Sequence, residues 1–182
     1  KMKFILNIQY KTLYLLLSLL IISCSKEDPE PINEEELITT VQLTFKTPGI
    51  TDQIVRWQEG SNNSDIISLA ANTQYEVEII FLDESDPSDI EDITEEVKEE
   101  ADEHQVFYQF SQLNISLEQS SSDTLDSNQN PLFVNSLWNT SEVGTGTVRV
   151  YLIHEPVTKS SSTRDGFAGE TDVAVDFLIT IE

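Results

Sequence analysis

The sequence predicts an all-β protein, mainly an antiparallel β-sandwich, with one acidic α-helix inserted between strands. Apolar residues alternate with polar ones in several segments, which is the period of a half-buried strand. Clusters of Gly, Pro, Asn and Ser separate these segments at short intervals, as turns do. One segment breaks the pattern, because its apolar residues recur at helical spacing.

The first strands are expected close to one another along the chain. Residues 41–45 alternate between apolar and polar, and a Thr-Pro-Gly turn follows. Residues 54–57 predict a second strand, which leads into a loop at 59–65. The clearest alternation lies at 75–81, where apolar side chains share one face and glutamates the other.

The segment around this last strand resembles a known structural feature. A leucine at position 69 and a Thr-x-Tyr triplet ending at Tyr75 precede the alternating residues. This order is similar to the tyrosine-corner segment of immunoglobulin-like and fibronectin type III sandwiches, where a leucine and a Thr-x-Tyr precede an alternating strand. The resemblance implies an immunoglobulin/fibronectin III-like arrangement of the strands.

Alternation returns toward the C-terminus at 113–117, 148–152 and 173–181. With these segments the chain is expected to hold about seven strands, as small sandwiches do. The connection at 155–170 is long and polar for a hairpin loop. Loops of this length in compact domains are usually functional or mobile.

The inserted helix is expected over about 90–104. Asp92 and Glu95 fit a capping pair at its N-terminus. The stretch from Asp83 to Glu103 holds 12 acidic residues in 21 positions, and several gather at the C-terminal end of the helix, where the dipole disfavours negative charge. This conflict indicates either a weak helix end or a site that binds a cation.

The N-terminal residues predict export and lipidation. Lysines precede the apolar run LYLLLSLLIISC at 13–24, which is shorter than the roughly 20 residues of a membrane span. Residues 1–23 are therefore interpreted as a signal peptide that is cleaved. The end of the run resembles the lipobox of bacterial lipoproteins, which implies that Cys24 carries diacylglycerol. An ordinary signal peptide with an incidental cysteine is the alternative.

Residues 24–37 are acidic and almost free of apolar side chains, which predicts a lipidated, solvated tether ahead of a domain at 38–182. The tether continues after the cysteine with Ser25, Lys26, Glu27 and Asp28. This tetrapeptide resembles the signal that directs Bacteroidota lipoproteins to the outer leaflet of the outer membrane. It implies a domain that faces out of the cell, and a periplasm-facing lipoprotein is the alternative.

The charge of the chain excludes one class of partner. The formal net charge is −23, with 33 acidic and 10 basic residues, whereas nucleic-acid binding needs clustered Lys and Arg. Electrostatic attraction to anionic lipid is disfavoured for the same reason, so membrane attachment is expected through the N-terminal acyl chains. Once Cys24, the only cysteine, is acylated, no thiol remains for a disulfide, a zinc site or a nucleophile.

One acidic loop is the candidate for cation binding. Its carboxylates are those of Asp83, Glu84, Asp86 and Asp89. Calcium takes six to eight oxygen ligands, so the loop predicts a Ca²⁺ site, although the glycine and closing glutamate of an EF-hand are absent. A solvated acidic loop is the alternative. His104, directly after two acidic residues, is a weaker candidate for a transition metal.

Sequence motifs for catalysis are absent, since the chain contains no GxSxG, HExxH or phosphate-binding loop. His104 and His154 are the only histidines, and they are interpreted as a helix-end residue and a strand-face residue. The protein is therefore expected not to be an enzyme and to need no cofactor. The tripeptide Asp-Thr-Leu at 123–125 resembles the motif at which Bacteroidota attach O-glycans, which implies modification of Thr124.

Taken together, several of these segments resemble one group of proteins. They are the lipobox, the acidic tether, the Leu-Ala-Ala-Asn-Thr-x-Tyr strand, the Asp-Ile-Thr-Glu-Glu helix, the Gly-Thr-Gly-Thr turn and the closing Gly-Glu-Thr-Asp strand. The combination is similar to small uncharacterised Bacteroidota lipoproteins that often carry the label "type 1 periplasmic binding fold superfamily protein". That label implies two α/β lobes, but strands and helices do not alternate here, so the β-sandwich prediction is retained.

Two functions from different classes fit these features. The first is a surface binding module that captures a ligand, or docks on a TonB-dependent transporter or another outer-membrane complex, through loops at one end of the sandwich. The second is a structural or adhesive immunoglobulin-like module, and a divalent-cation-binding lipoprotein is a further alternative. An aromatic concavity near Trp57, Trp138 and Phe167 would favour the first function. A uniformly acidic surface without a pocket would favour the second.

Overall fold

A computed structural model describes residues 36–61 and 64–182 of the chain. The predicted signal peptide at 1–23, Cys24 and nearly all of the predicted tether lie outside the described residues. The predicted export signal also lies outside them, at Ser25, Lys26, Glu27 and Asp28. Within the described part, no helix has both the length and the apolar character needed to cross a bilayer.

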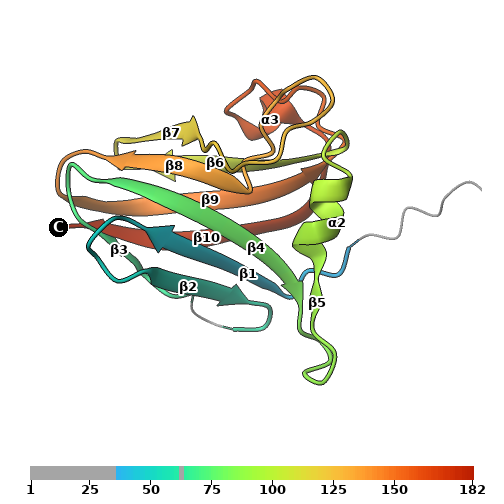
Figure 1. Ribbon diagram of the computed structural model, residues 1–182, viewed down its shortest axis with the longest axis horizontal. Coiled ribbons are helices and arrows are strands. Elements are labelled where there is room, and N and C mark those ends of the chain that lie inside the picture. The colour runs from blue at the N-terminus through green and yellow to red at the C-terminus, as the bar shows by residue number, and fades with distance from the viewer. Residues whose placement is uncertain (1–35, 62–63) are drawn as a thin grey trace, which may run out of the picture. The chain divides into compact units, whose positions relative to one another are not determined.

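Two β-sheets pack against each other around one apolar core (Figure 1), so the prediction of a mainly all-β sandwich is confirmed. The first sheet has the order β2 (Gln53–Gln58), β1 (Thr40–Lys46), β4 (Gln74–Asp83), β8 (Asn135–Thr140) and β7 (Ile115–Gln119), with β5 (Glu91–Asp92) added to β4. The second has the order β3 (Ile67–Leu69), β10 (Glu170–Ile181), β9 (Gly144–His154) and β6 (His104–Ser111). β6 and β7 are therefore edge strands of the two sheets.

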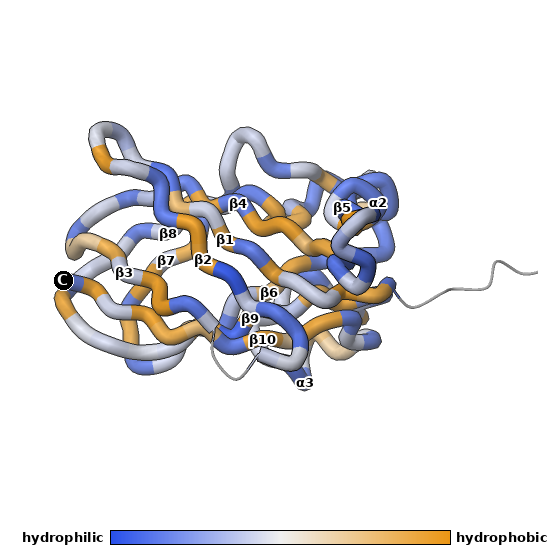
Figure 2. The backbone as a smooth tube through the Cα atoms, turned by 90° about the horizontal axis from the view of Figure 1, so that it is seen from below, coloured by the Kyte–Doolittle hydropathy of each residue, from blue (hydrophilic) through white to orange (hydrophobic). Residues whose placement is uncertain are grey.

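Trp138 lies at the centre of the core and is fully buried. Rings from both sheets meet it edge-on, with centroid distances of 5.3 Å to Phe45, 5.3 Å to Tyr108 and 4.8 Å to Phe110. Such edge-to-face contacts stabilise beyond the area that they bury. Figure 2 shows hydrophobic and hydrophilic residues following one another along the strands, as expected when one face of each strand packs inward.

One pair of strands in this mainly antiparallel sandwich is parallel. β3 pairs parallel to the end of β10, with Ile67 opposite Ile179 and Leu69 opposite Ile181. β2 belongs to the first sheet and β3 to the second, so the chain changes sheets between them. The short β3 then runs beside the last strand in the same direction. Backbone hydrogen bonds between residue 182 and residues 69 and 71 continue this pairing.

The helix is shorter than predicted. α2 spans Ile93–Glu99, where about 90–104 was expected. Before it, Glu91 and Asp92 form β5 on the end of β4, and after it His104 already belongs to β6. Asp92 caps the helix by accepting the N–H of Thr94, whereas Glu95 pairs with Lys98. The capping-pair prediction is thus correct for Asp92 alone.

Two local features link the sequence predictions to this fold. The hydroxyl of Tyr75 accepts the backbone N–H of Ala70 at 2.8 Å, which is the contact of a tyrosine corner. The immunoglobulin-like connectivity itself stays a prediction. The loop between β9 and β10 contains a single helical turn, α3 (Arg164–Phe167), and Phe167 is fully buried. This loop is therefore packed against the domain and does not extend freely into solvent.

Candidate functional sites at the two ends of strand β6

In the part of the chain that the structure describes, β9 is the one strand that pairs with β6. All eight of its residues face β9. On its other side, the N–H of Val106 donates to the carbonyl of Leu132 at 3.0 Å. Beyond that bond, toward the C-terminal end of the strand, β6 borders an open groove, whereas its first residue, His104, belongs to a buried cluster of charged side chains. These two places are the candidate functional sites.

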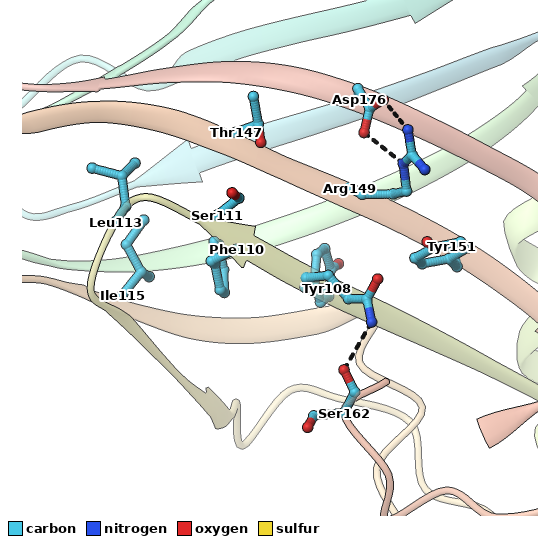
Figure 3. Close-up of a pocket in the computed structure, with 11 residues that line it drawn as sticks. Tyr108, Phe110, Ser111, Leu113, Ile115, Thr147, Arg149, Tyr151, Ser162 and Asp176 are labelled. Carbon is cyan, nitrogen blue, oxygen red and sulfur yellow. Dashed lines mark hydrogen bonds and ion pairs between the residues drawn. The ribbon is translucent and has the colours of Figure 1, made fainter. Parts of the chain in front are cut away.

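The groove has a volume of about 780 Å³ and follows the free edge of β6 (Figure 3). It is lined by Tyr108, Gln109, Phe110, Ser111, Leu113, Ile115, Thr147, Arg149, Tyr151, Ser162 and Asp176. Aromatic and aliphatic side chains alternate with polar ones in this set. A mixed lining of this kind is typical of sites that both bury apolar surface and orient polar groups.

A row of polar residues crosses the groove from strand to strand. Gln109 on β6 lies opposite Arg149 on β9, and Arg149 lies opposite Asp176 on β10. The guanidinium of Arg149 forms a bidentate ion pair with Asp176, visible in Figure 3. The amide nitrogen of Gln109 donates to the carbonyl of Ser162 at 2.9 Å, so the β9–β10 loop forms one wall of the groove.

That wall is held in place by a small second core on the outer face of the sheet. Phe167 stacks on Phe107 with ring centroids 3.9 Å apart and meets Tyr151 edge-on at 5.5 Å. Ile153 completes the cluster and is fully buried. Burial of these side chains fixes the loop against β6 and β9.

At the other end of β6, the two histidines lie side by side. His104 and His154 occupy paired positions on β6 and β9, and their rings stack with centroids 4.9 Å apart. Both are buried on the core side of the sheet. The interpretation of His154 as a strand-face residue agrees with this position, whereas His104 begins a strand and does not end a helix.

Carboxylates surround His104. Its Nε2 lies 3.2 Å from Oε1 of Glu36 and 3.9 Å from Oδ2 of Asp172. Its Nδ1 lies 3.3 Å from the backbone oxygen of Glu100 and 3.8 Å from Oε2 of the same residue. Burial of the ring alone would lower the pKa of His104, but the hydrogen bond and charge of Glu36 outweigh burial, so the pKa is raised above its ordinary value.

Asp172 reaches this cluster because β10 carries a bulge. Thr171 pairs with Ile153 and Val173 with Leu152, which leaves Asp172 as an extra residue between adjacent pairs. Its side chain is only 6% exposed, and its Oδ2 has no hydrogen-bond partner among the described residues. Burial, reinforced by the nearby charge of Glu36, raises the pKa of Asp172 to about 6.

The predicted calcium loop has a different arrangement. Glu84 accepts hydrogen bonds from Arg56, Thr40 and Gln58, and the Arg56 hydrogen bond lowers the pKa of Glu84 to about 2. Asp83 and Asp86 accept the backbone N–H groups of Ser85 and Ser88, which are local turn contacts. Asp89 follows, with its N–H bonded to the carbonyl of Asp86. Among the described residues, ligand atoms that converge within 4.8 Å belong to Glu36, Glu100 and His104 instead.

Other residues singled out in the sequence lie in structural positions. Trp138 and Phe167 are fully buried in the two cores. Thr124 is half-buried, and its carbonyl accepts the N–H of Leu132. The neighbouring Asp123 accepts the N–H groups of Phe133 and Asn135, so it organises the loop before β8. Modification of Thr124 stays a prediction.

Sequence reasoning missed Glu36, Asp172 and the groove beside β6. Glu36 was assigned to the tether and Asp172 to the start of the closing strand. The one available signal was the conflict between the acidic residues after α2, which include Glu100, and the helix dipole. Comparison with known proteins adds no relative to this picture: no family model, curated protein or solved structure matches the chain.

Proposed function

We propose that this protein is a non-enzymatic, lipid-anchored binding module of the outer-membrane surface, and that the groove along β6 is its binding site. The observation that carries the proposal is the edge of β6 beyond Val106, where no described strand pairs with it and an open groove of about 780 Å³ lies beside it. An exposed strand edge offers backbone donors and acceptors that an incoming strand can use. Pockets for alternate side chains then supply selectivity.

The occupant that fits best is an extended segment of a partner protein. The groove follows a strand and is open, so it suits a chain better than a compact small molecule. Ser111 and Thr147, opposite each other on β6 and β9, and the Arg149–Asp176 pair offer hydrogen-bonding groups. Because the chain carries a net charge of −23, a partner segment with basic residues has the complementary charge. A TonB-dependent transporter is the proposed partner.

The test is a pulldown of the full chain in its membrane, with a substitution that fills the groove. Ser111→Arg places a long side chain at an exposed position of β6 that lines the groove. We expect an outer-membrane transporter to be recovered with the wild-type chain and to be lost with Ser111→Arg. Protease treatment of intact cells, run in parallel, is expected to degrade the domain because it faces outward.

The matched control is Ser68→Arg. Ser68 is also an exposed serine on an edge strand of the second sheet, but it lies on β3 at the opposite edge. It should leave recovery of the transporter unchanged. Loss of recovery in both variants, or in neither, would contradict binding at the groove. Recovery of the chain alone would favour the structural or adhesive module, and resistance to protease would favour a periplasm-facing lipoprotein.

A further inference from the structure

We propose that Glu36, Glu100 and His104, whose ligand atoms lie within 4.8 Å of one another, form with the adjacent Asp172 a binding site for a divalent transition-metal ion of the Zn²⁺ class. The site is independent of the groove and of the function proposed for it. It brings together side chains from the segment before β1, from the C-terminal end of α2, from β6 and from β10. Imidazole and carboxylate groups are the nitrogen and oxygen ligands that zinc accepts in proteins.

The first argument is the orientation of His104. Its Nδ1 lies 3.3 Å from the carbonyl oxygen of Glu100, which favours the tautomer with the proton on that nitrogen. Nε2, on the other side of the ring, is hydrogen-bonded to Glu36 and also faces Asp172. A metal ion bound there would replace the proton of Nε2. Histidines that bind metals almost always donate their other ring N–H to a carbonyl or carboxylate in this way.

The second argument is the pair of buried oxygens without a hydrogen bond. Within residues 36–61 and 64–182, neither Oε2 of Glu36 nor Oδ2 of Asp172 has a hydrogen-bond partner, although the two side chains are only 11% and 6% exposed. Buried carboxylate oxygens are rarely left in this state, because the desolvation of a charge is costly. A cation bound beside Nε2 would offset the negative charge of both carboxylates.

The third argument is the spacing and the bulge. Two ligand atoms that each lie about 2.1 Å from one zinc ion are roughly 3.4 Å apart in a tetrahedral site. The observed separations of Nε2 from Glu36 and Asp172, 3.2 and 3.9 Å, bracket that value. Bulges are found next to functional sites, where they redirect a side chain, and the bulge in β10 is located at Asp172.

Charge balance points in the same direction. Glu36, Glu100 and Asp172 lie around His104, and Glu103 lies 3.5 Å from Nε2 of His154. No lysine or arginine forms an ion pair with any of these acids among the described residues. A divalent ion would supply positive charge where the acidic groups outnumber the histidines. The single imidazole beside several carboxylates favours a borderline metal over calcium, which prefers oxygen ligands alone.

The test uses the full chain, solubilised in detergent and stripped with a chelator. Zn²⁺ is titrated by calorimetry, and Co²⁺ replaces it for absorption spectroscopy. We expect one equivalent of Zn²⁺ to bind and the ring nitrogens of His104 to shift in NMR spectra. Glu36→Gln, Asp172→Asn and Glu100→Gln should each weaken binding by about tenfold or more, since even outer-shell changes cost that much.

Glu99→Gln is the matched control for Glu100→Gln, because it removes the same charge from an exposed neighbour on α2. It should leave the affinity unchanged. Glu100 is itself largely exposed, so its variant is expected to fold, and the NMR experiment needs no variant at all. Absence of Zn²⁺ binding, unchanged His104 signals, or tighter binding of Ca²⁺ than of Zn²⁺ would each overturn the proposal, leaving a plain cluster of ion pairs.

Discussion

Arg56 and Glu84 connect β2 to the end of β4, with one guanidinium nitrogen of Arg56 placed 2.7 Å from each oxygen of the Glu84 carboxylate. Thr40 on β1 donates to the same carboxylate at 2.6 Å. Three adjacent strands of the first sheet therefore meet at one acidic side chain. Calcium binding by the loop that contains Glu84 stays a prediction, whereas these hydrogen bonds are expected to have a measurable effect on stability.

Glu84→Gln is expected to lower the free energy of unfolding by about 1 kcal/mol. The amide keeps the shape of the side chain but loses its charge-assisted hydrogen bonds with Arg56 and Thr40. Urea denaturation measures the change. Glu78→Gln is the matched control, because the Lys46–Glu78 pair is more exposed, and such pairs contribute only about 0–1 kcal/mol. Equal losses in the two variants would contradict the role assigned to Glu84.

The contribution of Glu84 is expected to depend on pH. Hydrogen bonding to Arg56, with that of Thr40, lowers its pKa from 4.5 to about 2 in the folded protein. A carboxyl group whose pKa is lowered by folding stabilises the native state above its unfolded pKa, and the stabilisation is lost as pH falls toward the folded pKa. The stability difference between wild type and Glu84→Gln should therefore be constant near neutral pH and shrink between pH 4.5 and 2. A difference that grows on acidification would contradict this assignment.

The sequence predicts strands well where only one face is buried. β4 and β10 alternate between buried and exposed residues, and both were expected at nearly their observed positions. β6 was missed because Val106, Phe107 and Tyr108 are all buried. Its outer face is covered by the loop that carries α3, so the period of two disappears from the sequence.

β8 was missed for a different reason. The side chains of β8 that face the core are those of Ser136, Trp138 and Thr140, and two of these three are polar. Ser136 is buried because it accepts the indole N–H of Trp138 at 3.0 Å. The alternation of apolar and polar residues in a sequence cannot distinguish a polar side chain that is hydrogen-bonded inside the core from one that faces solvent.

The candidate metal site lies beyond pattern reasoning altogether. Glu36, His104 and Asp172 are each more than sixty positions apart in the chain. They meet because β6 and β10 both flank β9 and because a bulge redirects one residue. Register and bulges are tertiary properties, and neither can be predicted from local alternation.

Lys159→Met is expected to destabilise the protein by about 2 kcal/mol. Lys159 donates to the carbonyl of Ala101 at 2.6 Å and lies 3.1 Å from the buried carboxylate of Asp126. Removing the ammonium leaves that carboxylate without its cation, although the N–H of Asn130 still bonds to it. Thermal unfolding measures the loss. Lys98→Met removes a lysine from an exposed pair on α2 and should change stability by less than about 0.5 kcal/mol.

Phe167→Ala is expected to cost about 3 kcal/mol and to release the loop that forms the wall of the groove. Phe167 is fully buried against Phe107 and Tyr151, and truncation of such a ring leaves a cavity. The N–H of Val157 now bonds to the carbonyl of Phe167, so its hydrogen exchange should accelerate and proteolysis within 155–169 should increase. Val157→Ala is the control, because that side chain is 80% exposed. If the ring anchors the loop, Phe167→Ala should also weaken recovery of the partner that binds in the groove. A loop that stays protected from hydrogen exchange and proteolysis in this variant would show that other contacts hold the wall.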